Sequence, residues 1–546
     1  MAFARRISKG LRSARRGTAL IVVLIVVVML SLGAYTFCEL MIAEAKATTL
    51  FEQDAQARML ADSGIELAAA VLGSPMDTSL ATLYHSPELF GGIALSGGET
   101  PLNVGRFSIV APVENDGTGQ IRFGTIDESS KWNLNALLSA GFSDEELLTI
   151  LLSVPGMTDV IADSILDWID SDESPREFGA ESSYYRALTP PYDAKNGRLD
   201  SLDELLLIQG VTPWLLYGED ANRNGRLDPN ENDGDLSAPW DNSDGVLDLG
   251  WSAYFTVHSR ETNLRSDGLE RINLNQALLT ELYDTLEEEF GPDMATFVVA
   301  FRLFGPVNPV SNGGAPTTGN QSADEALKKL AEDIAKGLFS GTAGDVTRNG
   351  LDLSGGSQVQ FVSLYELIDA EVAAVVDGKE TLLASPWTSG SSDLANNWPL
   401  VADSLSLSDS SWLEGRININ QARYEVLLGI PGMTSTIADG IVSQRLIGSD
   451  GAALADRMTI QSTTAWLLSE GIMDQTELVS MDKYITARGS VHRVQSVGHF
   501  DGGGPVARVE AVIDATELPP RIIFRRDLSS LGPGFTSDQL AGVAAP

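Results

Sequence analysis

The stretch ARRGTALIVVLIVVVMLSLGAYTFC, residues 14–38, decides the fold of this 546-residue chain. Six Lys or Arg and no acid occupy residues 1–17, and the 21 residues that follow carry no charge. At a rise of ~1.5 Å per residue, a helix of that length spans about 30 Å, enough to cross a bilayer. Basic residues before such a segment favour a cytoplasmic N-terminus, so the chain after Glu39 is expected outside the cytoplasm.

The helical pattern continues beyond the apolar segment. Apolar residues recur at an approximately helical spacing from Leu40 to about Leu72, with polar residues largely between them. We therefore predict one long helix, apolar all round in its first half and amphipathic in its second. A cleaved secretory signal would be shorter and would end in small residues, which the sequence CELMIAEAK after the apolar run does not offer. A plain, uncleaved membrane anchor stays open as the alternative.

This pattern resembles the type IV pilin and pseudopilin family. In that family a prepilin peptidase cuts before the apolar stretch, after a Gly that follows basic residues. The resemblance implies cleavage between Gly17 and Thr18, often followed by N-methylation. The family usually has a Glu five residues into the mature chain, where this sequence has Val22. That departure matches one branch, the minor pseudopilin K of type II secretion systems, which generally lacks this Glu.

Composition restricts the partners of the outer part of the chain. Beyond residue 17 there are 31 Lys or Arg and 75 Asp or Glu, a net charge of −44. Such a surface repels nucleic acid, because phosphate binding needs clustered cations. A hydrophobic content of 43% excludes wholesale disorder. Cys38 is the only cysteine, so no intrachain disulfide is available.

Strand-like segments lie at both ends of a long helical block. We expect a hairpin from residues 104–113 and 120–127 around an Asn-Asp-Gly turn, and alternating strands at 484–500 and 506–515, with a further strand at 521–526. The simplest architecture is an α+β fold, in which the long helix packs on a small antiparallel sheet and carries a large helical insertion. The minor pseudopilin K family resembles this arrangement.

The expected domain division follows from these segments. It comprises a leader (1–17), a transmembrane segment (18–38), the first part of a pilin-like domain (39–127), an inserted helical domain (128–480) and the strands that complete the pilin-like domain (481–546).

The helical block contains internal repeats. The motifs KWNLN (131–135), RINLN (271–275) and RININ (416–420) each precede a helical pattern, and we expect the final Asn to cap that helix. Two copies continue into VPGMTDVIADSILDWI (154–169) and IPGMTSTIADGIVSQR (430–445), which indicate a helix, a Pro-Gly turn and a second helix.

Helix-turn-helix units of this kind can bind DNA phosphates, but the sparse basic residues around the turns favour simple packing. In the minor pseudopilin K family, similar helical units carry Asn-Leu-Asn and Pro-Gly-Met-Thr-like segments. The resemblance covers the N-terminal helix, both repeats and the C-terminal strands.

The segment DANRNGRLDPNE, residues 220–231, follows the pattern of a calcium loop. Gly225 permits the sharp turn at position 6, and Leu227 would anchor the loop to the core. The expected ligands are Asp220, Asn222, Asn224, the Arg226 carbonyl, Asp228 through a water, and Glu231. Pro229 argues against a standard exit helix, so the segment predicts a calcium loop without a full EF-hand. An acidic turn without an ion stays open as the alternative. Two amide ligands imply weaker binding than in a cytosolic buffer, which suits a compartment rich in calcium.

A second acidic cluster comprises Asp167, Asp170, Asp172, Glu173, Glu177 and Glu181. The family resemblance implies calcium in this region, with Asp170, Asp172 and Glu181 as its ligands, although solvated acids and helix capping would also account for them. The segment DNSDGVLD, residues 241–248, has the composition of a third site without the register.

No enzyme signature emerges. The four histidines lack metal-ligand spacing, and no nucleophile elbow, phosphate loop or dinucleotide fingerprint occurs. The resemblance therefore implies a structural role: a minor pseudopilin at the tip of the type II secretion pseudopilus, which helps to start its assembly and protein secretion. The implied location is the inner membrane with a large periplasmic domain, and the implied partners are the prepilin peptidase and the I-type and J-type minor pseudopilins. The alternative is an uncleaved, membrane-anchored, calcium-dependent binding or adhesion protein.

Overall fold

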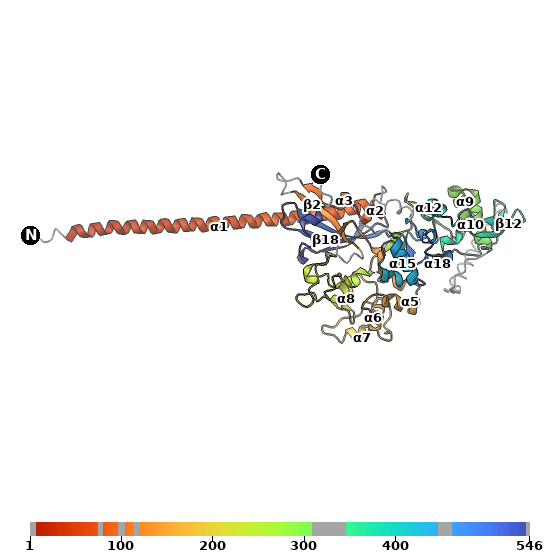
Figure 1. Ribbon diagram of the computed structural model, residues 1–546, viewed down its shortest axis with the longest axis horizontal. Helices are drawn as coiled ribbons and strands as arrows, with labels where there is room; N and C mark the ends of the chain where they lie inside the picture. Colours follow the sequence, from red (N-terminus) through yellow and green to blue (C-terminus); the bar gives the residue numbers. More distant parts are fainter. Residues whose placement is uncertain are drawn as a thin grey trace, which may run out of the picture.

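The chain begins with a single long helix, α1 (Ile7–Leu72), that projects far out of the rest of the molecule (Figure 1). The structure, a computed structural model, describes residues 7–74, 80–96, 104–113, 121–307, 346–445 and 461–541. The large apolar side chains from Leu20 to Ile42 are all exposed. Among the described residues, one helical stretch, Ala19–Leu72, is long and apolar enough to cross a membrane. The predicted long helix is confirmed.

The second half of α1 lies on a sheet. Its buried side chains follow a helical spacing and are mostly small: Ala57, Leu60, Ala61, Ile65 and Ala68. Small residues on both sides allow a close approach between helix and strand. A Cβ on Gly498 of the central strand would overlap the Ala57 carbonyl, so this position needs glycine.

The sheet under α1 is antiparallel and joins both ends of the chain. Its order is β1 (Ile93–Ser96), β2 (Gly105–Pro112), β17 (Val491–Phe500), β18 (Ala507–Asp514) and β19 (Arg521–Asp527). Two short strands extend it, β3 (Ile121–Phe123) on β2 and β4 (Ile126–Asp127) on β17. The predicted strands at both ends of the helical block are confirmed, and so is the α+β class.

The predicted N-terminal hairpin is also present. Val110 of β2 pairs with Phe123 of β3, while the expected Asn-Asp-Gly turn lies outside the described residues. Val110 also pairs with Gln495 of β17, so strands about 385 positions apart in sequence are neighbours in space. The helical block is thus inserted between adjacent strands of one sheet. The domain boundaries given above stay predictions.

The insertion is built from three copies of one module. Each module opens with an Asn-x-Asn motif on a two-residue strand, which pairs in parallel with a two-residue strand near the module's end. The pairs are β5 (Trp132–Asn133) with β6 (Phe255–Thr256), β8 (Ile272–Asn273) with β13 (Leu405–Ser406), and β15 (Ile417–Asn418) with β16 (Ile485–Thr486). We call residues 131–258, 271–408 and 416–488 modules 1, 2 and 3.

Each module closes with the same local turn. The hydroxyls of Thr256, Ser406 and Thr486 accept a hydrogen bond from the backbone N–H two residues later, at 3.1, 3.2 and 3.4 Å. Short side chains with a hydroxyl favour such turns because they satisfy a backbone donor locally. The repetition extends the two matches seen in sequence to three structural copies.

A helix pair follows the opening strand in every module. The pairs are α5 (Asp144–Leu152) with α6 (Asp159–Ile169), α9 (Leu279–Phe290) with α10 (Pro292–Phe304), and α14 (Tyr424–Leu428) with α15 (Ser435–Gln444). In modules 1 and 3 the second helix is capped as expected, because Thr158 and Thr434 accept from the N–H of Ile161 and Ile437 at 3.4 and 3.2 Å.

The expectation that the final Asn of each motif caps a helix is wrong. The first Asn has the local role: the side chain of Asn133 accepts from the N–H of Asn135 at 3.0 Å. The Asn135 amide instead bridges the module, donating to the carbonyls of Leu199 and Val257 at 2.9 and 3.0 Å. Asn275 and Asn420 make corresponding long-range bonds. Buried backbone groups far along the chain need partners, and these amides supply them.

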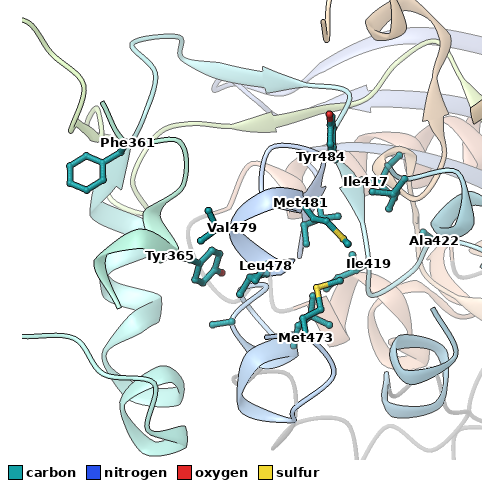
Figure 2. Packing of buried hydrophobic residues seen from close by; sticks show 14 of the residues in the cluster. Phe361, Tyr365, Ile417, Ile419, Ala422, Met473, Leu478, Val479, Met481 and Tyr484 are labelled. Atoms are coloured by element: carbon teal, nitrogen blue, oxygen red, sulfur yellow. The ribbon is translucent and has the colours of Figure 1, made fainter. Parts of the chain in front are cut away.

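Modules 2 and 3 share a core. Tyr365 on η6 (Leu364–Leu367) lies beside Leu478 and Val479 of α18 (Gln475–Met481), and Ile419 faces the same helix (Figure 2). Module 2 also contains a four-stranded sheet, which the expectation of a mostly helical insertion did not include. Its order is β12 (Lys379–Ala384), β11 (Glu371–Val376), β10 (Leu351–Asp352) and β9 (Thr347–Arg348).

Candidate metal centre

The end of α6 carries buried acids on one helix face. Asp163, Asp167 and Asp170 are spaced by four and three residues, which places them above one another along the helix. Asp167 is completely buried, and Asp170 is the half-buried C-cap residue. The loop that follows returns over this face, because the N–H groups of Arg176 and Phe178 donate to Asp167 and Asp163.

Three carboxylates converge where that loop returns. Oxygen atoms of Asp167, Asp170 and Glu181 all lie within 4.8 Å of one another. We call these three residues the α6 carboxylate site. Gly179 allows the convergence, because a Cβ at this position would overlap the Asp167 carboxylate.

Of the three carboxylates, that of Glu181 has the fewest hydrogen-bond partners in the protein. The residue is 2% exposed, and both of its carboxylate oxygens are buried without a hydrogen-bond partner. Arg176 Nε lies 3.7 Å from Asp167 Oδ1, the one ion pair to this site among the described residues. A buried charge without partners is costly, so the site requires either a proton or a bound cation.

The carboxyl groups of the site have raised pKa values, because little positive charge lies near them. Burial raises the pKa of Asp167 to about 6. Burial and then the neighbouring carboxylates of Asp167 and Asp170 raise the pKa of Glu181 to about 7. Carboxylates this close share protons or bind a cation, and oxygen-only ligands suit a hard ion such as calcium.

Two of the three ligands expected here, Asp170 and Glu181, lie in this site, and the third, Asp172, does not. Asp172 is exposed, and its side chain accepts from the Ser174 N–H at 2.7 Å. Asp167 supplies the third carboxylate of the site instead. Its position two residues before the end of α6, four residues after Asp163 on the same helix face, was the available sequence signal.

In the 220–231 loop, backbone N–H groups donate to the loop's own acidic side chains. Asp220 accepts from the N–H groups of Asn224 and Gly225 at 3.0 and 2.9 Å, and Glu231 from those of Ala221 and Asp228 at 3.1 and 3.0 Å. The backbone at Gly225 has φ 69°, as expected for the sharp turn.

The expected ligand side chains of this loop lie together. The amides of Asn222 and Asn224 both donate to Asp228 Oδ2, at 2.6 and 2.9 Å. Asp220 and Glu231 are buried, at 7% and 1% exposure, and burial raises their pKa values to about 6 and about 7. The Arg226 N–H donates to Asn224 Oδ1 at 2.7 Å, which tightens the turn. The loop offers the residue types that bind calcium, but its carboxylates do not form a convergent group like that of the α6 carboxylate site in the described part of the chain.

This loop also joins module 1 to the sheet. The Arg223 carbonyl accepts from Gln495 of β17 and from Arg508 of β18, at 2.9 and 2.8 Å. The Asn224 amide donates to the Gly534 carbonyl at 2.8 Å. Order in the loop is therefore coupled to the position of the insertion on the sheet.

The third acidic segment, 241–248, forms an exposed turn. Asp241 accepts from the N–H groups of Asp233, Gly234 and Ser243 at 2.8–2.9 Å. Its acids do not join the convergent group found among the described residues.

The segment that carries the α6 carboxylate site has known relatives. Residues 130–217 match the sequence profile of the family described as "Type II secretion system (T2SS), protein K". Two relatives named type II secretion system protein K share sequence with the chain. The protein from Aeromonas hydrophila is 36% identical over 132 residues, covering 21% of this chain and 38% of the relative. The protein from Klebsiella pneumoniae is 28% identical over 217 residues, covering 37% and 60%.

The chain thus spans less than two thirds of each of these relatives. A weak structural likeness, at TM-score 0.30 and 11% identity, covers 89% of this chain and 99% of a chain in the crystal structure of the GspK-GspI-GspJ complex from the enterotoxigenic Escherichia coli type 2 secretion system. A likeness at that level adds nothing about fold or partners. On the sequence matches, part of the chain, residues 130–217 above all, is similar to the type II secretion system protein K family.

Proposed function

We propose that the chain is a minor pseudopilin of type II secretion, anchored in the inner membrane through residues 18–38 with its remaining domains in the periplasm. The observation that carries the proposal is the two-part character of α1. Its first half is apolar and exposed on every side, whereas its second half is docked on a sheet. A helix apolar all round needs lipid or other apolar helices around it.

Assembly with other pseudopilins accounts for the exposed part beyond the membrane segment. Ile42, Leu50, Phe51 and Met59 lie beyond the membrane segment and remain 51%, 54%, 76% and 68% exposed. These side chains would contact the corresponding helices of the I-type and J-type minor pseudopilins. The bulk of the three modules would hinder the stacking of a subunit above, which suits the tip of the pseudopilus. Val22 suits the same place. In the pilin family the Glu usual at this position pairs with the terminal amino group of a neighbouring subunit, and a tip subunit has no neighbour above it.

Calcium would serve as a structural ion in this role. The α6 carboxylate site supports the proposal with two unpartnered, buried Glu181 oxygens, and the 220–231 loop supports it with its clustered donors. Asp167, Asp170 and Glu181 would hold the ion in the α6 carboxylate site, and the ion would supply positive charge beside Glu181. No catalytic step is assigned to either site.

Co-purification tests the assembly role. Full-length chain is co-expressed with the I-type and J-type minor pseudopilins, extracted in mild detergent and isolated through a tag. Ile42→Lys, Ala45→Glu and Phe51→Glu should each reduce recovery of the partners, because a charge on an apolar helix interface is costly. Glu288→Lys, on the exposed face of α9, is the control for a charge change and should leave recovery unchanged.

The rival function is an uncleaved, membrane-anchored, calcium-dependent binding or adhesion protein. It predicts an intact Met1 and no dependence on the partner helices. Equal recovery of partners with wild type and Phe51→Glu would favour this rival.

A further inference from the structure

A cavity of about 640 Å³ lies where module 2 meets module 3. Arg271 and Leu405 of module 2 line it together with Arg416 and Asp482 of module 3. Two other lining side chains, Val362 and Leu400, are 52% and 65% exposed, so the cavity opens to solvent. Its volume falls in the range of about 300–1,000 Å³ that is typical of ligand sites.

The three modules open with equivalent cations, and one of the three differs from the others in its ion pairing. Each module opens with a cation two residues before its first Asn: Lys131, Arg271 and Arg416. Lys131 pairs with Glu128 at 3.6 Å, and Arg416 pairs with Glu261 and Asp482 at 3.0 and 3.4 Å. In the described part of the chain, Arg271 has no ion pair, and its polar contact is a 3.5 Å hydrogen bond to Asn263 Oδ1.

The acids that line the cavity are already engaged. Arg416 holds Glu261 and Asp482, Arg198 holds Glu414, and Asp403 accepts from the Ser266 N–H and hydroxyl. Three lining cations form no ion pair with any described carboxylate: Arg271, Arg488 and Lys483. The lining holds four cations and four carboxylates, so the cavity is close to neutral as a whole, and its cations without an ion pair to a described carboxylate are these three.

Unsatisfied donors line the same cavity. The Nε atoms of Arg271 and Arg416 and the hydroxyl of Thr463 are buried without a hydrogen-bond partner. Buried donors normally find an acceptor, and a guanidinium binds a carboxylate through two parallel bonds. Burial lowers the pKa of Arg271, and an anion beside the guanidinium would offset that effect.

We propose that this cavity binds an acidic peptide segment of another protein, with an Asp or Glu carboxylate on Arg271 and Arg488 and a neighbouring apolar side chain against Leu400 and Val362. An inorganic anion would satisfy the arginines but would leave most of the cavity and its apolar lining, which includes Leu364, Leu407 and Leu413, uncovered. Elsewhere the acidic surface of the chain repels such segments, so the cavity would select both the partner and its orientation.

Peptide binding to the full-length chain in detergent tests this site. The probe is a pool of C-amidated peptides with a neutral rhodamine label, a single central Glu and flanking Leu, Ile, Val or Phe; the matched pool carries Gln instead. Anisotropy titrations should give the Glu pool at least about tenfold tighter binding, the difference expected for a charge-assisted hydrogen bond. Arg271→Gln should weaken the Glu pool to the level of the Gln pool.

Three further variants separate charge, geometry and folding. Arg271→Lys keeps the charge without the two-pronged donor and should fall between wild type and Arg271→Gln. Arg488→Gln, at an exposed position, should weaken binding a few-fold with an unchanged melting curve. Lys379→Gln removes one charge outside the cavity and should bind as wild type does.

Equal affinity for the Glu and Gln pools, or affinity for neither, would overturn the proposal. Inorganic phosphate that binds in an Arg271-dependent way, when neither pool binds, would overturn it in favour of a small anion. Retention of the Glu preference in both Arg271→Gln and Arg488→Gln would place the peptide elsewhere.

Discussion

The α6 carboxylate site and the 220–231 loop use the same residue types in opposite ways. In the loop, every carboxylate oxygen of Asp220 and Glu231 accepts a backbone N–H, so the loop has partners of its own. In the α6 carboxylate site, Glu181 has none. Good calcium-loop spacing in the sequence therefore does not mark the place where the fold most needs a cation. That need is greatest where a helix and a returning loop force carboxylates together.

Calcium removal should produce the largest effect and should act mainly through the α6 carboxylate site. A hundredfold excess of calcium over its Kd adds about 2.7 kcal/mol to stability, which for a chain of this size corresponds to a melting temperature higher by roughly 3 °C. Glu181→Gln should remove most of this response, whereas Asp220→Ala combined with Glu231→Ala should remove less. Calorimetric melting of the full chain in calcium and in chelator measures both.

Asp172→Asn is the matched control for that experiment. It removes an exposed acid from the same segment and should change stability by less than about 0.5 kcal/mol while keeping the calcium response. A melting curve indifferent to chelator would refute both sites. A calcium response that the loop variant abolishes but Glu181→Gln keeps would show that calcium acts mainly through the 220–231 loop and not through the α6 carboxylate site.

Gly179→Ala should be the next largest effect. The added methyl group would overlap the Asp167 carboxylate and separate the carboxylates, at a cost of about 1–3 kcal/mol. Its melting temperature should fall in both calcium and chelator, and its calcium response should shrink. Gly197→Ala, in the same module but clear of such overlap, serves as the control. Equal stability of the two variants would show that the loop can yield at Gly179.

The pH dependence of the metal-free chain should give a smaller effect of defined sign. The unfolded pKa values of Asp and Glu are about 4, whereas the folded pKa values are about 6 for Asp167 and about 7 for Glu181. The folded chain therefore binds more protons between those values, so its stability should fall as pH rises from about 4.5 to 7. In chelator, Glu181→Gln should flatten this slope. A slope of the opposite sign in wild type would show that these carboxyl groups are not buried as described.

The sequence predicted well wherever a pattern is periodic. The helix to Leu72, the strands at both ends and the capping by Thr158 and Thr434 all follow from local spacing and side-chain type. The role of Asn135 was missed because its partners, Leu199 and Val257, lie far along the chain. The sheet of module 2 was missed although Asp377-Gly378, both at positive φ, forms a hairpin turn between β11 and β12.

The site residues show the same limit. Asp170 and Glu181 could be named from an acidic loop beside a helix end, but the choice between Asp167 and Asp172 depends on how that loop folds back. The loop has no periodicity from which to read this. Likewise Lys131, Arg271 and Arg416 look alike in sequence, and only the fold shows that Arg271 has no ion pair among the described residues.

The central claim, that the chain is a processed pseudopilin, is tested most directly by the mass of the N-terminal peptide of membrane-extracted protein, with and without the prepilin peptidase. We predict a new N-terminus at Thr18 in the presence of the peptidase, often methylated, and intact precursor for Gly17→Val, because the peptidase must fit a small residue at the membrane surface. An intact Met1 in wild type, or normal maturation of Gly17→Val, would contradict the account.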